Sequence, residues 1–196
     1  MHKYDLTDRK TLLASLPKGL VCAEIGVADG LLSQFIVDEC KPSMLYLIDP
    51  WICVTEGPYS TDASNGPSQA YKDGQHASVC RRFASNENVT ILRAKSLEMA
   101  EAAKWTGPIM FDWVYIDGNH LEVEADIAAW WPLILPGGWL LGHDYTTAGE
   151  HITVKQGVDD FVRREGLELF IAGLDSDDIY ERNYPTWMVR KAADRR

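Results

Sequence analysis

The chain has 196 residues, of which 46% are hydrophobic and 24% charged, and its 19 Lys and Arg against 29 Asp and Glu give a formal net charge of −10. This balance is typical of a globular protein, and the length suits one domain spanning residues 1–196. The excess of acids disfavours a nucleic acid or an anionic membrane as partner, because binding phosphate requires clustered Lys and Arg.

Cysteine spacing and the N-terminal segment exclude further classes of protein. The four cysteines are scattered without a Cys-x-x-Cys pair, which predicts neither a zinc knuckle nor a disulfide framework. The N-terminal residues lack an apolar signal core, and no apolar stretch approaches the roughly 20 residues needed to cross a bilayer. We therefore expect a cytoplasmic protein with a small-molecule substrate, and the oligomeric state, a homo-oligomer included, stays open.

Short apolar runs alternate with amphipathic stretches along the chain. Runs of strand length occupy residues 20–25, 44–49, 89–94, 111–117 and 138–142, and two late strand candidates lie at 167–172 and 186–190. Helical spacing of apolar residues marks 31–36, 97–104, 123–134 and 154–162. Continuous apolar strands alternating with helices predict an α/β doubly wound, Rossmann-like fold with a largely parallel sheet.

Two segments interrupt this alternation. Residues 55–74 are rich in Gly, Pro, Ser, Asn and Asp, and they are too long for an ordinary turn between a strand and a helix. We expect them to form a mobile lid or binding loop. Residues 175–185 separate the two late strand candidates.

The first strand end offers a glycine-containing loop, Glu24-Ile-Gly26-Val27-Ala-Asp-Gly30. Ligands of open α/β sheets bind beyond the carboxyl ends of the strands, and the two glycines permit a tight turn and close backbone approach. The Gly-x-x-x-Gly spacing differs from the Gly-x-Gly-x-x-Gly of a dinucleotide site, so it suits a ligand with a carboxylate better than one with a diphosphate. A plain turn between strand and helix is the alternative.

Two further strand ends carry residues of interest. Asp49 lies 25 residues after Glu24, close to the ~20-residue offset at which nucleoside-binding folds place a ribose-binding acid. Its carboxylate can accept hydrogen bonds from both ribose hydroxyls, although an exposed Asp before a proline turn would have the same sequence. Ser96 is placed to cap the helix that follows it, and it could also lie at the edge of an adenine ring.

The fourth and fifth strand ends each place a histidine beside an aspartate. The fourth ends in Asp117-Gly-Asn-His120, and the fifth in Gly-His143-Asp144-Tyr145. Adjacent strand ends with paired titratable groups favour catalysis or metal binding over packing.

Taken together, these motifs resemble the class I S-adenosylmethionine-dependent methyltransferases, and in particular a small bacterial-type group similar to methyltransferase family 24. The resemblance covers roughly residues 17 to 190. The matching pieces are Glu24-x-Gly26-x-x-x-Gly30, Asp49-x-Trp51, Ser96, Val114-Tyr-Ile-Asp117-Gly-x-His120, Trp130-Trp-Pro-Leu, Leu135-Pro-Gly-Gly138 and Gly142-His-Asp-Tyr145.

The resemblance implies a seven-stranded sheet whose last strand, 186–190, is antiparallel, and it implies roles for particular residues. Asp49 would hold the ribose, and Asp117 would lie close to the sulfonium and the substrate. The segment 55–74 would close over the site to exclude water. The residues expected to line the cofactor are Glu24, Gly26, Val27, Gly30, Asp49, Trp51, Ser96 and Asp117.

Methyl transfer to a hydroxyl needs an aligned nucleophile and a proton acceptor. Proximity and orientation supply much of the barrier lowering, and His120 or His143 could accept the proton near neutral pH, beside Asp117. Related O-methyltransferases hold a divalent cation on strand-end carboxylates, and Asp117 and Asp144 match two such positions for Mg²⁺. Tyr145 occupies the place where a metal-dependent relative would carry Asn or Asp, so metal dependence stays open.

The function expected from the resemblance is O-methylation of a small-molecule hydroxyl, on a sugar or a natural product. Two alternatives remain: an NAD-dependent oxidoreductase on the same class of sheet, against which the glycine spacing speaks, and a cofactor-binding protein without transfer activity, against which the two Asp/His strand ends speak.

Overall fold

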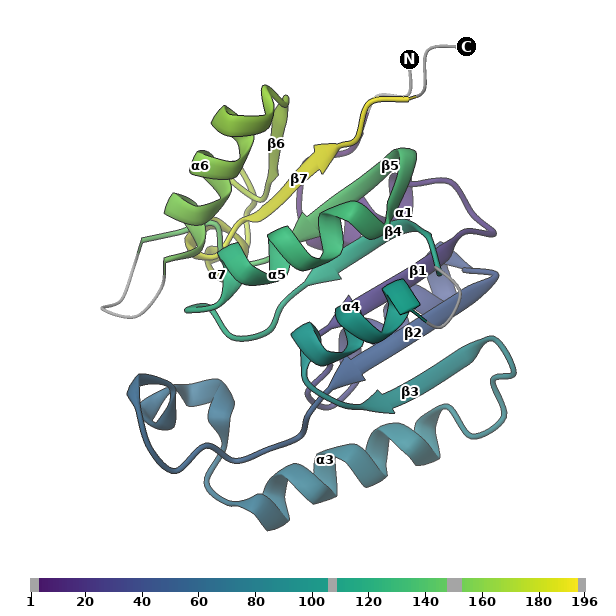
Figure 1. The fold of residues 1–196 in the computed structure, drawn as a ribbon, viewed down its shortest axis with the longest axis vertical. Helices are drawn as coiled ribbons and strands as arrows, with labels where there is room; N and C mark the ends of the chain where they lie inside the picture. Colours follow the sequence, from purple (N-terminus) through teal and green to yellow (C-terminus); the bar gives the residue numbers. More distant parts are fainter. Residues whose placement is uncertain (1–3, 106–108, 148–152, 194–196) are drawn as a thin grey trace.

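The computed structural model describes residues 4–105, 109–147 and 153–193. These residues form a seven-stranded sheet in the order β3-β2-β1-β4-β5-β7-β6, with helices on both faces (Figure 1). The strands are β1 (Val21–Ile25), β2 (Met44–Asp49), β3 (Val89–Arg93), β4 (Phe111–Ile116), β5 (Ile134–Gly142), β6 (Leu169–Ala172) and β7 (Thr186–Arg190). This confirms the α/β fold class predicted from the alternation of apolar runs and amphipathic stretches.

Strands β1 to β5 are parallel, and β7 runs antiparallel to both of its neighbours, β5 and β6. The antiparallel late strand at 186–190 is therefore confirmed. Parallel strands have their carboxyl ends on one edge of the sheet, where α/β folds bind ligands. In Figure 1 this edge lies on the left, where the arrowheads of β2 and β3 point.

The helices divide between the two faces of the sheet. On one face α1 (Arg9–Ser15), α2 (Leu31–Phe35), its π-helical continuation (Ile36–Cys40) and α3 (Gln69–Arg82) contribute to one apolar core. On the other face α4 (Ser96–Trp105), α5 (Val123–Trp130) and α6 (Val154–Glu165) contribute to a second core. A short helix, α7 (Ile179–Asn183), precedes β7. No helix in the described ranges is long and apolar enough to cross a membrane.

Several boundaries differ from the sequence prediction. The segment predicted as a lid, 55–74, is not wholly a loop, because α3 begins at Gln69 and two 3-10 turns occupy Pro58–Thr61 and Ala63–Asn65. The helix expected over 123–134 ends as an α-helix at Trp130, and a 3-10 turn leads into β5. No helix was predicted at α1, α3 or α7. Of these, α1 and α7 are short, and short helices depend more on tertiary contacts than on propensity.

Candidate functional site

The loop after β1 lies directly against the end of β4. Gly26 has a φ of +87°, and a Cβ added there would lie 2.0 Å from the carbonyl oxygen of Asp117. Any other residue would therefore both strain the backbone and collide with the neighbouring strand. This contact brings the predicted glycine loop and the predicted catalytic strand end together.

Asp49 ties this loop to the end of β2. Its Oδ2 accepts hydrogen bonds from the backbone N–H groups of Val27, at 2.9 Å, and Ala28, at 3.0 Å, and its Oδ1 accepts one from Trp51 at 2.6 Å. The residue is 8% exposed. Asp49 thus shapes the loop, and its predicted contact with a ribose stays a prediction.

Trp51 and Glu24 are buried beneath the loop. The Trp51 indole N–H donates to the carbonyl oxygen of Ala28 at 2.8 Å, and the side chain is fully buried, so in this structure it supports the loop from below. The Glu24 carboxylate accepts a 2.5 Å hydrogen bond from the Ser33 hydroxyl of α2. Burial raises the pKa of Glu24 to about 8, although the Ser33 hydrogen bond opposes the rise.

Gly30 is the N-cap residue before α2 and has a left-handed φ of 76°, and Ser96 is the first residue of α4. The Ser96 hydroxyl donates to Asp126 at 2.5 Å and accepts from the Trp130 indole at 2.8 Å. The expectation that this side chain caps its own helix is corrected here, because its hydroxyl instead links α4 to α5. A contact of Ser96 with adenine remains a prediction.

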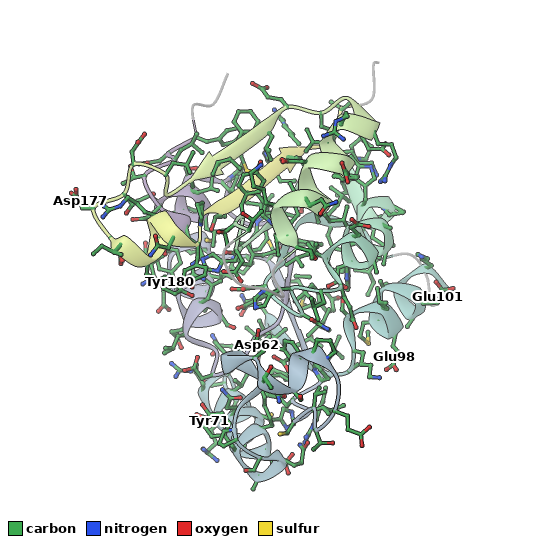
Figure 2. The ribbon with its side chains drawn as sticks, turned by 90° about the vertical axis from the view of Figure 1, so that its left-hand side faces the viewer. Asp62, Tyr71, Glu98, Glu101, Asp177 and Tyr180 are labelled. Atoms are coloured by element: carbon green, nitrogen blue, oxygen red, sulfur yellow. The ribbon has the colours of Figure 1, made fainter. Side chains whose placement is uncertain are left out.

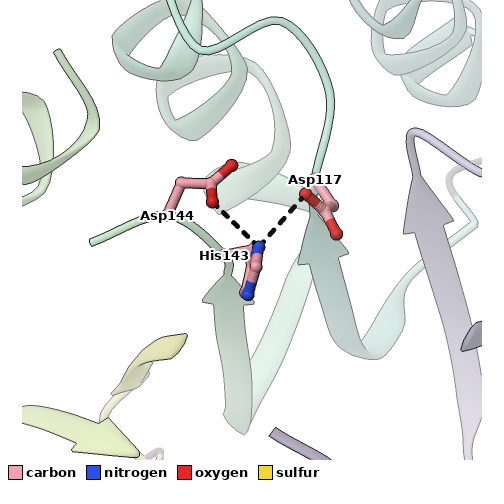
Figure 3. Close-up of side chains that lie close together, drawn as sticks. All are labelled: Asp117, His143 and Asp144. Atoms are coloured by element: carbon pink, nitrogen blue, oxygen red, sulfur yellow. Dashed lines mark ion pairs between the residues drawn. The ribbon is translucent and has the colours of Figure 1, made fainter. Parts of the chain in front are cut away.

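The fourth and fifth strand ends bring together Asp117, His120, His143 and Asp144, which we call the acid–histidine cluster. Figure 3 shows three of these side chains, Asp117, His143 and Asp144. The two Asp144 oxygens contact the two histidines separately: Oδ2 lies 2.9 Å from His120 Nδ1, and Oδ1 lies 3.0 Å from His143 Nδ1. His143 Nδ1 is also 3.7 Å from Asp117 Oδ1. One carboxylate therefore orients both imidazoles.

Asp144 reaches both rings from a left-handed backbone conformation with a φ of 56°. Aspartate tolerates this region better than most residues, and such strain is often found at functional sites. Gly142, the residue before His143, leaves no room for a side chain, because a Cβ would lie 2.6 Å from Trp187 and from the carbonyl oxygen of Ile116. The tight packing of β5 against β4 and β7 thus sets the position of His143 and Asp144.

The electrostatics of the cluster follow from these contacts. Burial works to raise the pKa of Asp144, but the hydrogen bonds from His120 and His143 outweigh it and hold the pKa well below its usual range. Burial likewise opposes protonation of His120, yet the carboxylates of Asp144, Asp62 and Asp117 raise the His120 pKa above its ordinary value. Burial raises the pKa of Asp117.

The two histidines differ in what their second nitrogen meets. His120 Nε2 lies 3.9 Å from Asp62 Oδ2, and 16% of the His120 side chain is exposed. The His143 ring stacks on Tyr180 of α7, 5.8 Å between centroids, and its Nε2 is buried without a hydrogen-bond partner. Of the two, His120 is the one whose free nitrogen faces accessible space.

The insert between β2 and α3 supplies Asp62, and it is held by its own hydrogen bonds. Asn65 is 2% exposed, exchanges hydrogen bonds of 2.8 Å with the backbone of Val54, and donates to the carbonyl oxygen of Ser60 at 3.1 Å. Figure 2 looks onto the carboxyl-end edge of the sheet, with Asp62 of the insert and Tyr180 of α7 labelled. The insert therefore contributes a charge to the site, and its closure over a bound ligand stays a prediction.

Arg9 of α1 is a site residue that the sequence interpretation missed. Its Nη1 lies 3.4 Å from Asp117 Oδ2, and its Nη2 lies 3.7 Å from Glu181 Oε1 of α7. The partners are 108 and 172 residues away along the chain, and the helix that carries Arg9 has no chemical motif. Asp62, Tyr180 and Glu181 were missed for the same reason.

A metal ion would find three candidate ligands in Asp117, His143 and Asp144, whose donor atoms lie within 4.8 Å of one another. The carboxylate oxygens, however, already face nitrogen donors of histidine and arginine. Tyr145 points elsewhere, since its hydroxyl donates to Asp159 of α6. The donor set therefore fits a hydrogen-bonded acid–histidine network better than Mg²⁺, which prefers oxygen ligands and water.

Comparison with solved structures shows the same fold in several proteins of low sequence identity. An O-methyltransferase from Bacillus cereus, solved with S-adenosylhomocysteine, has a TM-score of 0.64 at 14% identity over 97% of this chain and 83% of its own. A protein from Corynebacterium glutamicum scores 0.63 at 19% identity, over 98% and 85%. The N-methyltransferase NodS from Bradyrhizobium japonicum, also solved with S-adenosylhomocysteine, scores 0.60 at 14% identity, over 93% and 85%.

Sequence comparisons complete this assignment. No curated protein matches the chain significantly. A family model described as a methyltransferase domain matches residues 23–145, which span the glycine loop, the strand ends and the acid–histidine cluster. This match covers more than half of the sequence, and the chain therefore belongs to this methyltransferase family and is a methyltransferase enzyme.

Proposed function

We propose that the protein transfers a methyl group from S-adenosylmethionine to a hydroxyl of a small molecule, with His120 as the proton acceptor. The observation that carries this proposal is the pairing of His120 with Asp144 beside Asp117, at the edge where the glycine loop lies. Solved proteins of similar fold include both O- and N-methyltransferases, so the hydroxyl is argued from the base and not from the fold.

The residues present fit this cofactor. Asp117 offers a carboxylate to the cationic part, and Gly26 leaves the loop backbone free of a side chain. Asp49, at the end of β2 and hydrogen-bonded to the same loop, is the residue we assign to the ribose. When bound, S-adenosylmethionine supplies a methyl group on a positively charged sulfur, ready for in-line displacement. The chain's own contribution is to hold the acceptor in line and to exclude water, because methyl transfer needs little covalent help.

His120 would take the proton from the acceptor hydroxyl. With Nδ1–H donating to Asp144, a neutral His120 keeps its lone pair on Nε2, the nitrogen that faces the insert. Asp144 thereby fixes the ring orientation and stabilises the imidazolium that forms. Asp62 of the insert lies 3.9 Å from the same nitrogen, which suits a segment that closes over the bound acceptor.

Direct binding tests the cofactor assignment. We expect S-adenosylhomocysteine to bind the purified protein in isothermal titration calorimetry, and to raise its melting temperature, whereas NAD should do neither. Asp49→Ala should weaken binding of S-adenosylhomocysteine and of 5′-methylthioadenosine alike, because both ligands carry the ribose and meet the same loop. Gly74→Ala, in α3 with nothing within 4 Å of the added Cβ, is the matched control. Binding of NAD with no binding of S-adenosylhomocysteine would overturn the proposal.

A role for Mg²⁺ at Asp117 and Asp144 is tested separately. We expect methyl transfer and cofactor binding to survive EDTA, because both carboxylates are engaged by nitrogen donors. Loss of transfer on chelation, restored by Mg²⁺ alone, would instead assign these two residues as metal ligands.

A further inference from the structure

Arg9 places a permanent positive charge among the acids of the site. It begins α1, where its backbone N–H donates to Glu181 Oε2 at 3.1 Å, and 18% of its side chain is exposed. Among the described residues, the ion pairs of Asp117, Asp144 and Glu181 involve this one guanidinium and two histidines. Arg9 is thus the cation of this group that stays charged at every relevant pH.

The guanidinium has bonding capacity that its present partners do not use. Its contacts with the two acids Asp117 and Glu181 are long, at 3.4 and 3.7 Å, whereas a charge-assisted hydrogen bond is normally about 2.7–2.9 Å. A further side-chain partner is the hydroxyl of Tyr115. The Arg9 Nε is buried without an acceptor. An arginine with unused donors is suited to a bidentate carboxylate, which presents two oxygens in the matching plane.

The Arg9–Asp117 pair has the charges needed by an α-amino acid. Such a group carries an ammonium and a carboxylate on one carbon, and the pair offers one opposite charge to each. Asp117 also lies against the Gly26 turn, so the pair adjoins the loop assigned to the cofactor. Without Arg9, an entering carboxylate would face several carboxylates and no permanent cation of this group.

We propose that Arg9 binds the α-carboxylate of the cofactor's amino-acid end and that this frees Asp117 to receive the ammonium. The inference deepens the proposed function and depends on it. Arg9 would thereby make binding selective for a cofactor whose amino-acid carboxylate is intact. Other residues would bind the adenosine end of the cofactor.

Removing the guanidinium from the protein, or the carboxylate from the ligand, tests this assignment. Binding of S-adenosylmethionine and of its decarboxylated form, which keeps the ammonium and the sulfonium, is measured calorimetrically for wild type, Arg9→Met and Arg9→Lys. We expect Arg9→Met to weaken binding of S-adenosylmethionine by roughly 10- to 100-fold, as for loss of a hydrogen-bonded charge pair. Binding of the decarboxylated form should change little, and Arg9→Lys should be intermediate.

Two further variants separate recognition from support of the fold. Lys10→Met, the exposed neighbour of Arg9 in α1, should leave both affinities unchanged. Glu181→Gln removes the other acidic partner, and it should leave the preference for the carboxylate intact if Arg9 acts on the ligand. Equal losses for both ligands in Arg9→Met, or no loss for either, would overturn the inference. Failure of wild type to bind either ligand would instead refute the proposed function itself.

Discussion

At the scale of single residues, the site depends on how Asp144 divides its two oxygens between two histidines. Each Nδ1 is engaged, at 2.9 and 3.0 Å, so each neutral ring leaves Nε2 as its basic nitrogen. Burial of His143 Nε2 and exposure of His120 toward Asp62 give the two rings different roles. His143 supports the cluster, and His120 is available to an acceptor.

This division predicts the effect of removing the base. His120→Gln should lower kcat by roughly 10²- to 10⁴-fold, the range for loss of a general base, while the affinity for S-adenosylhomocysteine stays the same. Turnover is measured as S-adenosylhomocysteine released with the best acceptor from a panel of small hydroxyl compounds. His76→Gln, in α3 against Trp51, serves as a control substitution of a histidine outside the cluster. An unchanged kcat in His120→Gln would contradict the assignment.

The pH dependence of turnover has a defined direction. A base must be deprotonated, and the surrounding carboxylates raise the pKa of His120, so kcat/KM should rise with pH through a value above that of an ordinary histidine. Asp62→Asn removes one of those carboxylates and should move the rise to lower pH. The pH profiles of wild type and Asp62→Asn check this prediction, and a shift to higher pH would contradict it.

The raised pKa of Glu24 predicts that the stability of the fold depends on pH. Burial raises its pKa to about 8 in the folded protein, whereas an ordinary Glu has a value of 4.5. The folded state therefore binds the proton more tightly than the unfolded state, so this contribution to stability is complete below pH 4.5 and is lost as pH rises toward about 8.

Glu24→Gln removes this proton-binding group and tests the effect. Between pH 5 and pH 8 the free energy of unfolding of the wild type should fall relative to that of Glu24→Gln, on the order of a few kcal/mol across the window. Urea unfolding at several pH values measures this difference. The exposed Glu87→Gln should follow the wild type, and parallel curves for wild type and Glu24→Gln would show that Glu24 is not the cause.

At the scale of elements, short α1 is held in place at its start. Asp8 accepts a 2.7 Å hydrogen bond from the N–H of Thr11, and the Thr11 hydroxyl accepts from the Asp8 N–H at 3.0 Å, which forms a capping box. Further along the helix, the side chains of Leu12 and Leu13 are buried in the core. These contacts fix the position of Arg9, the first residue of the helix.

The cap predicts a coupled loss of stability and binding. Asp8→Ala should lower the free energy of unfolding by about 1 kcal/mol, and it should weaken binding of S-adenosylmethionine by displacing Arg9. Urea unfolding and calorimetry measure the two effects. Lys10→Ala, which makes no cap, should leave both nearly unchanged, and full affinity in a destabilised Asp8→Ala would show that α1 does not position Arg9.

At the scale of the whole molecule, one sheet joins two cores. Leu140 and Leu141 are consecutive in β5, both fully buried, and they face opposite sides of the sheet. Because β5 lies between β4 and β7, both cores depend on the same central strands. We therefore expect the two cores to unfold together.

Substitution on either face tests this cooperativity. Leu140→Ala and Leu141→Ala should each lower the free energy of unfolding by about 2–5 kcal/mol, as for other buried leucines. Both should shift a single transition, seen identically by fluorescence and circular dichroism. The exposed Leu97→Ala is the control. Two separate transitions in either variant would show that the faces unfold independently.

The sequence predicted those features that arise from local pattern. The strands at 44–49 and 186–190 coincide with the observed β2 and β7, because long apolar runs and their flanking turns are local signals. The acid–histidine pairs Asp117/His120 and His143/Asp144 were found in the same way, since the carboxyl ends of neighbouring parallel strands lie at one edge of the sheet. Local signals could not reveal α1 and α7, which are too short to form without tertiary contacts.

The sequence by itself therefore determined the class of fold, the strand ends and the candidate acids and histidines. Only the tertiary structure decided what these residues touch. It turned Asp49 and Trp51 toward the loop, gave Asp144 two histidine partners, and brought Arg9 within 3.4 Å of Asp117. The physical reason is distance along the chain, because a contact across 108 residues leaves no periodicity or spacing in the sequence, and only packing of the sheet and helices creates it.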